Sequence, residues 1–99
     1  MDCIFCKIAN GEIPSDTVFE DDNFKVILDL SPASKGHMLI LPKTHARDIT
    51  ELGEDIAGKA IVLAAKLGKA SMAALGATGF NTLANTGESA GQTVFHCHI

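Results

Sequence analysis

Two histidines near the end of this 99-residue chain, in the run GQTVFHCHI, have residue types and a spacing that could support chemistry. Side chains alternate along a strand, so a strand here would place His96 and His98 on one face and the apolar Phe95, Cys97 and Ile99 on the other. We expect the apolar set to face the core, and the imidazoles, roughly 6.6 Å apart at Cα, to lie on the open face. The spacing alone is equally typical of solvated imidazoles on a half-exposed strand.

The loop TGESAGQT, which leads into this run, makes a functional site more plausible than a pair of solvated imidazoles. Two glycines and several small polar residues allow successive N–H groups to point into a concavity that would hold a phosphate, although most such loops are plain turns. A neutral imidazole is a competent nucleophile toward phosphorus when its far nitrogen donates to a fixed acceptor, and backbone amides stabilise charge on phosphoryl oxygens. The combination favours phosphoryl or nucleotidyl transfer through a histidine.

Cys3 and Cys6 form a second pattern that could support chemistry, a C-x-x-C at the start of the chain. Its turn lets two thiolates reach one tetrahedral zinc ion, which needs two more ligands, and His45 and His96 are available. The main alternative is a thioredoxin-like redox motif, but such motifs follow a strand, and no strand precedes Cys3. Two free thiols in a small helix are the remaining alternative. Cys97 points away from the histidine face, which argues against it as a ligand beside His96.

The elements that must position these residues are mostly predicted to be strands. Runs rich in β-branched and aromatic residues, bounded by turn residues, indicate a hairpin and three further strands. A short helical turn in CIFCKIANGEI, ended by Gly11, comes before them. The expected strands are, in chain order, TVFE, FKVILDL, HMLILP, FNTLAN and QTVFHCHI.

One long helix is predicted between the third and fourth strands. Asp48 and Glu51 could form a capping box, but Gly53 and Gly58 weaken the first turns and favour a start a few residues later, and Gly76 lies at the expected end. Apolar residues recur mostly at steps of three and four, as on one helical face. They are Ile49, Leu52, Ile56, Ala60, Leu63, Leu67 and Ala74.

This order of elements predicts an α+β fold, with an antiparallel sheet of about five strands, one long helix and a short N-terminal helix. Residues 1–99 are expected to form a single domain. The net charge of −4 disfavours binding to nucleic acid, and the longest apolar run, AIVLAA, is far too short to span a membrane. Three cysteines without a secretion signal favour a cytoplasmic protein.

The run GQTVFHCHI resembles the motif of the histidine triad (HIT) family, and GHMLILPKTH, LDLSP, CIFCKI and NTLAN match the same family in the expected order. The resemblance spans essentially the whole chain and is strongest to the Hint-like, zinc-binding branch. It implies a HIT-like fold and hydrolysis of adenosine phosphoramidates or related phosphoanhydrides through a nucleotidyl-histidine. The third histidine of the motif would fall one position after Ile99, so we expect a domain truncated at its C-terminal end.

The resemblance also implies roles for individual residues. His98 matches the nucleophile, Thr93 a hydroxyl donor to the scissile bridge, and His37 a supporting histidine whose alternative is a buried structural role. The implied nucleotide contacts are Asp29 at the ribose, Leu30, Asn85, Gly91, Gln92, Thr93 and His98, with Leu28, Ile4, Phe5 and Ile8 completing an apolar slot for the base. Taken alone, Asp29 is typical of a turn, Thr93 of a strand and the apolar residues of a core.

The metal and partners follow from the same resemblance. Cys3, Cys6, His45 and His96 would close a structural zinc site with no open position. The implied partners are a purine nucleotide and a second copy of the chain, as a homodimer. Two other functions remain open from the sequence: a non-catalytic module that binds purine nucleotides, and a dinucleoside polyphosphate hydrolase. A zinc-stabilised structural domain is a third alternative.

Overall fold

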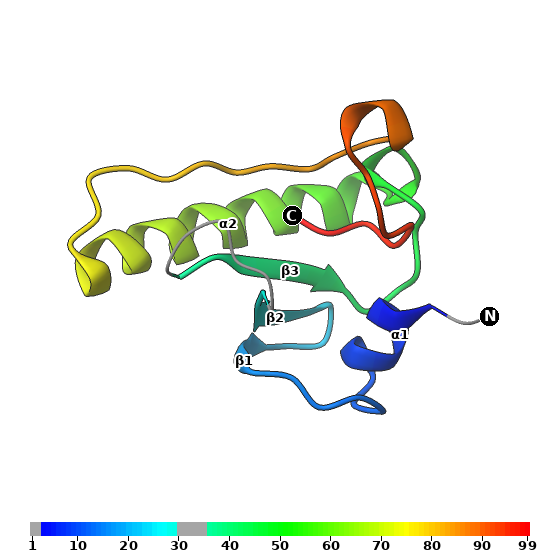
Figure 1. Cartoon of the computed structure of the whole chain (residues 1–99), viewed down its shortest axis with the longest axis horizontal. Coiled ribbons are helices and arrows are strands. Elements are labelled where there is room, and N and C mark those ends of the chain that lie inside the picture. The colour runs from blue at the N-terminus through cyan, green and yellow to red at the C-terminus, as the bar shows by residue number, and fades with distance from the viewer. Residues whose placement is uncertain (1–2, 30–35) are drawn as a thin grey trace.

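Three antiparallel strands form the sheet of the computed structural model, which describes residues 3–29 and 36–99. β1 (Thr17–Glu20) pairs with β2 (Phe24–Leu28), and β2 pairs with β3 (Met38–Pro42), so the strands lie in sequence order (Figure 1). The β1–β2 turn is closed by Asp21, whose Oδ1 accepts two backbone N–H groups at 2.9 and 2.8 Å. The predicted hairpin and the strand that follows it are confirmed.

One face of the sheet packs against the long helix α2 (Glu54–Leu75), which runs across it in Figure 1. Phe24 and Val26 of β2 point to this face because side chains alternate along a strand, and Ile40 of β3 joins them. Their partners are small residues of α2, chiefly Ala60, which is fully buried. Small side chains let the helix approach the sheet closely, so this layer forms the main core.

The opposite face of the sheet packs against the short helix α1 (Ile4–Ala9). Ile27 of β2 and Leu41 of β3, one position out of phase with the first set, contact Ile8 of this helix. Lys25 also points to this side, is nearly buried, and donates from Nζ to the carbonyl of Ile8 at 3.1 Å. Because the last carbonyls of a helix lack partners within the helix, this ammonium caps α1 and ties it to β2.

The start of α2 agrees with the prediction that the helix begins a few residues after Asp48, although Gly58 lies inside it. Asp48 caps a single 3₁₀ turn (Ile49–Glu51), where its Oδ1 accepts the N–H of Thr50 at 2.9 Å, and α2 begins only after Gly53. At the other end Gly76 has a φ of +70°, the left-handed conformation that ends a helix at little cost for glycine. Within the described residues, no helix is both long and apolar enough to cross a membrane.

The fourth and fifth predicted strands are not assigned as strands in the described part of the chain. Residues 80–85 run extended beside α2 but join no ladder, because no strand lies next to them (Figure 1). The last residues come closer to the prediction: Ile99 exchanges both backbone hydrogen bonds with Ile40 of β3, at 2.8 and 3.2 Å. One such pair places the segment along the free edge of β3, and it is enough to position the histidines.

A matched pair of glycines in α2 tests this packing. Changing Gly58 to alanine adds a Cβ in open space and should stabilise the fold by about 0.5–1 kcal/mol through helix propensity. The same change at Gly68 puts the Cβ into the ring of Phe80, and overpacking costs about 1–3 kcal/mol. Chemical denaturation should therefore rank Gly58→Ala above wild type and Gly68→Ala below Gly58→Ala. Equal stability of the two variants would show that Phe80 does not pack on α2.

Candidate functional site

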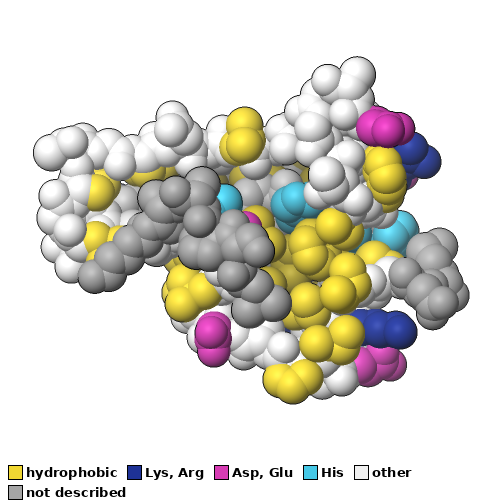
Figure 2. Space-filling view, in the orientation of Figure 1, with side chains coloured by type: hydrophobic (Ala, Val, Ile, Leu, Met, Phe, Trp, Pro, Cys, Tyr) yellow, Lys and Arg dark blue, Asp and Glu magenta, His cyan; other side chains and the backbone are white. Residues whose placement is uncertain are grey.

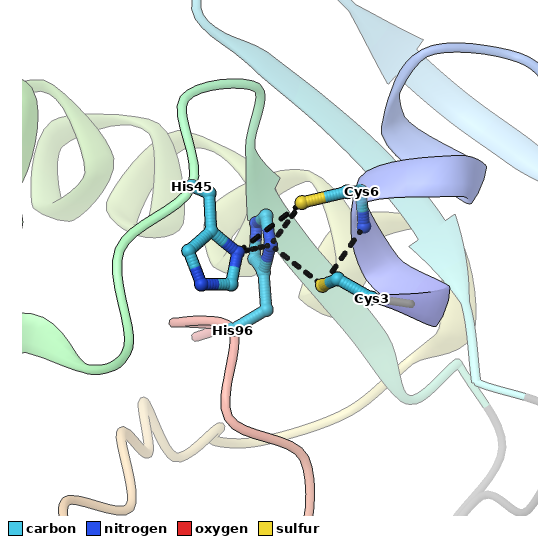
Figure 3. A group of neighbouring side chains, drawn as sticks. All are labelled: Cys3, Cys6, His45 and His96. Carbon is cyan, nitrogen blue, oxygen red and sulfur yellow. Dashed lines mark hydrogen bonds between the residues drawn. The ribbon is translucent and has the colours of Figure 1, made fainter. Parts of the chain in front are cut away.

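Two cysteines of the N-terminal turn and two histidines from distant segments converge on one point (Figure 3). Cys3 caps α1 and Cys6 lies within it, His45 follows β3, and His96 lies in the terminal segment beside β3. Their four ligand atoms lie within 4.8 Å of one another. The structure thus brings together the four residues that the sequence proposed as metal ligands.

The distances within this group fit a tetrahedral ion. The sulfur of Cys6 lies 3.2 Å from Nδ1 of His45 and 3.3 Å from Nδ1 of His96, and the sulfur of Cys3 lies 3.4 Å from the latter. The two Nδ1 atoms are 3.1 Å apart. Zinc bonds of about 2.3 Å to sulfur and about 2.0–2.1 Å to nitrogen give tetrahedral edges of about 3.5 and 3.3 Å. The donor atoms are therefore spaced as ligands of one ion require.

The protonation of His96 supports the same conclusion. Its Nε2 lies 2.8 Å from the carbonyl oxygen of Pro42, and since a carbonyl can only accept, Nε2 carries the proton. Nδ1 then presents a lone pair to the centre of the group, the tautomer that a metal-ligating histidine needs. Burial lowers the pKa of His96, which keeps the ring neutral at pH 7.

The thiol of Cys6 is held in its protonated form without a metal. Burial, followed by the hydrogen bond and charge of Cys3, raises the pKa of Cys6 to about 11. A metal must displace this proton, so metal affinity should fall as the pH falls. Cys97 is not part of the group, as expected. It packs with Ala46 and Leu52, and burial raises its pKa to about 11.

The expectation that both imidazoles lie on an open face is wrong for His96, which is fully buried. The terminal segment is held on both sides. Ile99 bonds to β3, and the N–H of Cys97 donates to the carbonyl of Ala46 at 2.7 Å. The ring of His96 is therefore enclosed between α1 and the end of β3, where the carbonyl of Pro42 accepts a hydrogen bond from Nε2–H.

His98 remains half-buried and reachable. Its Nδ1 lies 2.8 Å from the carbonyl oxygen of His96, so Nδ1 donates and Nε2 keeps a free lone pair. The ring of Phe5 packs edge-on against that of His98, with 4.9 Å between centroids and an angle of 88°. Because Phe5 lies between Cys3 and Cys6 in sequence, one short helix both lines the metal group and supports this imidazole.

The loop before the histidines has a defined turn. Gly87 and Gly91 adopt φ of +86° and +98° and flank a 3₁₀ turn (Glu88–Ala90). The N–H groups of Ala90 and Gln92 bond to the carbonyl of Gly87, and that of Gly91 to Glu88, which closes the turn. These amides are thus already used within the loop rather than pointing into a concavity.

The other side chains predicted to contact a nucleotide border this loop to different degrees. Thr93 is exposed, so its hydroxyl is accessible to a ligand. Asn85 donates from Nδ2 to the carbonyl of Gly91 at 3.4 Å, which joins the residues beside α2 to the loop. Gln92, in contrast, is only 2% exposed.

Asp29 and His37 lie together at the end of β2 and the start of β3. Nε2 of His37 is 3.7 Å from Oδ2 of Asp29, and the N–H of Asp29 donates to the carbonyl of His37 at 3.0 Å. His37 is only partly buried, unlike a core histidine. Leu30 lies outside the described residues. Two residues of the apolar slot proposed for the base, Ile4 and Leu28, are exposed. Figure 2 shows hydrophobic side chains beside histidines on one face of the molecule.

Sequence reasoning missed three groups that shape the site. The carbonyl of Pro42, which fixes His96, leaves no trace in a sequence. Lys25 did leave a signal, as a lone charge inside the apolar run FKVIL. The guanidinium of Arg47 lies 4.5 Å above the ring of Phe95 and braces the segment after His45 against the histidine run.

Comparison with known proteins gives one family and several close relatives. The HIT domain model matches residues 10–99. Protein hit of Bacillus subtilis is 43% identical over 97 residues, covering 98% of this chain and 67% of its own length. Adenosine 5'-monophosphoramidase hnt1 of Schizosaccharomyces pombe is 40% identical over 99 residues, covering 100% and 71%. Adenylylsulfatase HINT3 of Arabidopsis thaliana is 41% identical over 98 residues, covering 99% of this chain, which spans only 50% of that protein.

A solved structure shows the same fold. The crystal structure of a Zn-bound histidine triad family protein from Mycobacterium smegmatis superimposes with a TM-score of 0.94 at 38% identity. It covers 99% of this chain and 71% of its own. The predicted α+β class, with one long helix and a short N-terminal helix, is confirmed by this likeness and by the described elements.

Proposed function

The chain belongs to the HIT domain family, and from that premise we propose that it cleaves a phosphoramidate or phosphoanhydride bond of a purine nucleotide, as a hydrolase or transferase. One observation carries the proposal: Nδ1 of His98 donates to the carbonyl of His96 and leaves the lone pair of Nε2 free on a half-buried imidazole, as a nucleophile requires. The relatives named as a monophosphoramidase and an adenylylsulfatase support this class of reaction.

The proposed reaction has two displacements at phosphorus. The lone pair of His98 Nε2 attacks the α-phosphorus and forms a P–N bond, while the bond from phosphorus to the leaving group breaks. The leaving nitrogen or oxygen takes the electron pair of that bond and a proton from solvent, while the exposed Thr93 hydroxyl is proposed to donate a hydrogen bond to the bridging atom. Water then attacks phosphorus and releases a proton to solvent, the P–N bond breaks with its electron pair returning to His98 Nε2, and the nucleoside monophosphate departs.

The proposed nucleotide site extends from His98 toward β2. Asp29 is proposed to accept hydrogen bonds from the ribose hydroxyls, since an ionised carboxylate only accepts and each hydroxyl has one O–H to donate. His37, 3.7 Å from that carboxylate, would hold it in place. The base would lie against Ile4, Phe5 and Leu28, with Leu30 proposed to complete the slot, whereas Ile8 packs in the core against Ile27 and Leu41. Asn85, Gly91, Thr93 and the backbone of Gln92 would border the phosphate.

The four-residue group is proposed to hold a structural zinc ion. Two sulfur and two nitrogen donors at tetrahedral spacing suit zinc, and a closed shell leaves no position for substrate. The Zn-bound relative from Mycobacterium smegmatis supports the choice of metal. Zinc would hold α1 against the histidine run, and so hold Phe5 against His98.

We also propose that the protein is a homodimer. Residues 80–85 lie extended without a partner strand in the described structure, and Leu83 is 69% exposed there. An unpaired extended segment with an exposed leucine is well suited to pair with a second copy. The expected cytoplasmic location stays a prediction.

Incubation with an adenosine phosphoramidate tests the proposed function. We expect release of AMP, and acid-labile labelling of the protein when the reaction is quenched early with substrate labelled at the α-phosphorus. The adduct should be lost and turnover should stop when His98 is replaced by glutamine.

Tight AMP binding without product would instead identify a non-catalytic nucleotide-binding module. If calorimetry shows no AMP binding at all, both the enzyme and the nucleotide-binding module are excluded, and a metal-stabilised structural domain remains. Faster turnover of a dinucleoside polyphosphate than of the phosphoramidate would change the substrate but keep the mechanism.

A further inference from the structure

The side-chain amide of Gln92 is fully engaged with backbone groups. Its Oε1 accepts the N–H of Gly87 at 2.9 Å, and its Nε2 donates to the carbonyls of Arg47 and Val94 at 2.6 and 3.1 Å. The side chain is 2% exposed. Since an amide nitrogen has two N–H groups, both of its donors are used.

The two carbonyls that Nε2 joins belong to the two segments that supply histidines to the metal group. Arg47 lies two residues after His45, and Val94 lies two residues before His96. The same segments meet through the N–H of Cys97 and the carbonyl of Ala46, at 2.7 Å. Gln92 thus adds a second hydrogen-bonded link, beside that of Cys97 and Ala46, between the segment after His45 and the histidine run.

Oε1 reaches in the other direction, into the glycine turn. Gly87 is the first residue of that turn, and its carbonyl already accepts the N–H groups of Ala90 and Gln92. Its own N–H is held by Oε1 of Gln92. Gln92 therefore bonds twice to Gly87 at the other end of the turn. Its side-chain Oε1 accepts the N–H of Gly87, and its backbone N–H donates to the carbonyl of Gly87.

We propose that Gln92 is a positioning residue, whose side chain aligns the glycine turn with the metal-binding segments and does not itself contact the nucleotide. This inference deepens the proposed function and rests on it for the role of the turn. A phosphate oxygen can only accept, so the Gln92 amide could bind phosphate only by giving up the carbonyl of Arg47 or Val94. Giving up either hydrogen bond would break a link that the side chain makes with the segment after His45 or with the histidine run, which favours the positioning role.

The wild-type protein provides a first test that needs neither turnover nor a mutation. In the ligand-free protein, NMR should show both Nε2 protons of Gln92 exchanging with water at least about tenfold more slowly than those of an exposed side-chain amide such as Asn10. Their protection should persist when AMP is added to saturation. Rapid exchange without AMP, or loss of protection on adding AMP, would overturn the proposal.

Gln92→Met provides the second test, because it keeps the length and apolar volume of the side chain and removes the amide. We expect amide exchange at Gly87 to quicken by about tenfold or more, and Co²⁺ affinity to fall by about three- to tenfold, since partners behind the ligands tune metal binding. The AMP dissociation constant should rise by about tenfold at a temperature where the variant is folded. Ser89→Ala, an exposed change in the same turn, should alter none of these values.

The readouts separate the possible roles. A direct contact with nucleotide would weaken AMP binding in Gln92→Met while leaving Gly87 exchange and Co²⁺ affinity unchanged, which overturns the proposal. A purely structural role would lower the melting temperature without changing AMP affinity, which also overturns it. Suppose instead that the wild-type protein turns over no nucleotide, but Gln92→Met still changes both the amide exchange of Gly87 and the Co²⁺ affinity. The proposed reaction then fails, while the proposed link made by Gln92 stands.

Discussion

Replacing His98 by alanine is expected to lower the turnover of an adenosine phosphoramidate by about 10⁴-fold or more, because loss of a nucleophile removes the covalent route altogether. The backbone orients the proposed nucleophile: the carbonyl of His96, 2.8 Å from Nδ1, favours the tautomer that leaves Nε2 unprotonated. Steady-state kinetics with purified wild type and variant would measure the change in kcat.

The control is that His98→Ala keeps its fold, its metal and its ligand. His98 is not one of the four metal-ligating residues, so Co²⁺ binding should be within about twofold of wild type. AMP should still bind, since the proposed base and ribose contacts come from other segments. A variant that binds AMP and metal normally and retains more than about a tenth of wild-type turnover would rule out His98 as the nucleophile.

Part of the metal group could be predicted from local pattern, because C-x-x-C spacing on one helical turn indicated two thiolate ligands. The family resemblance selected His45 and His96 from the four histidines, and the structure brings all four ligand residues together. The hairpin and β3 followed from runs of β-branched and aromatic residues bounded by turn residues, because both depend on neighbours close in sequence. Gly53 correctly indicated a later start of α2, whereas Gly58 lies inside the helix.

The rest depended on contacts that no local pattern encodes. Alternation predicted an open face for His96, but whether a strand face is open depends on what packs there, and α1 with the end of β3 encloses that ring. Residues 80–85 have strand propensity but lack a neighbouring strand. Gln92 looks like any loop glutamine in the sequence, and only the approach of a segment 45 residues away gives its amide the carbonyl of Arg47 as a partner.

Removing the metal is expected to destabilise the domain strongly, because the four residues join the N-terminal helix, the segment after β3 and the terminal run. An ion present at about 1,000 times its dissociation constant adds about 4 kcal/mol to the free energy of unfolding. For a domain of this size that corresponds to a melting temperature lower by about 15–30 °C in the metal-free protein. Calorimetry of the zinc-loaded protein, before and after chelation, would measure it.

The three cysteines provide the matched variants for this prediction. Cys3→Ala should abolish the absorption of tetrahedral Co²⁺. Its stability in zinc should fall to that of the chelated wild type. Cys97→Ala should keep the metal and lose only packing, since Cys97 lies in a separate apolar cluster. Zinc affinity of Cys97→Ala, which keeps all four ligands, should fall by about tenfold or more per pH unit on acidification, because zinc displaces a proton from Cys6, whose pKa is raised to about 11.

The metal should also influence the reaction at His98 without touching the substrate. Phe5 packs on that imidazole from the helix turn that Cys3 and Cys6 anchor, so metal loss frees the ring that supports the nucleophile. Cys3→Ala should therefore lower kcat more than it weakens AMP binding, even below its melting temperature. An unchanged kcat in a metal-free, folded Cys3→Ala protein would show that the metal supports the fold alone.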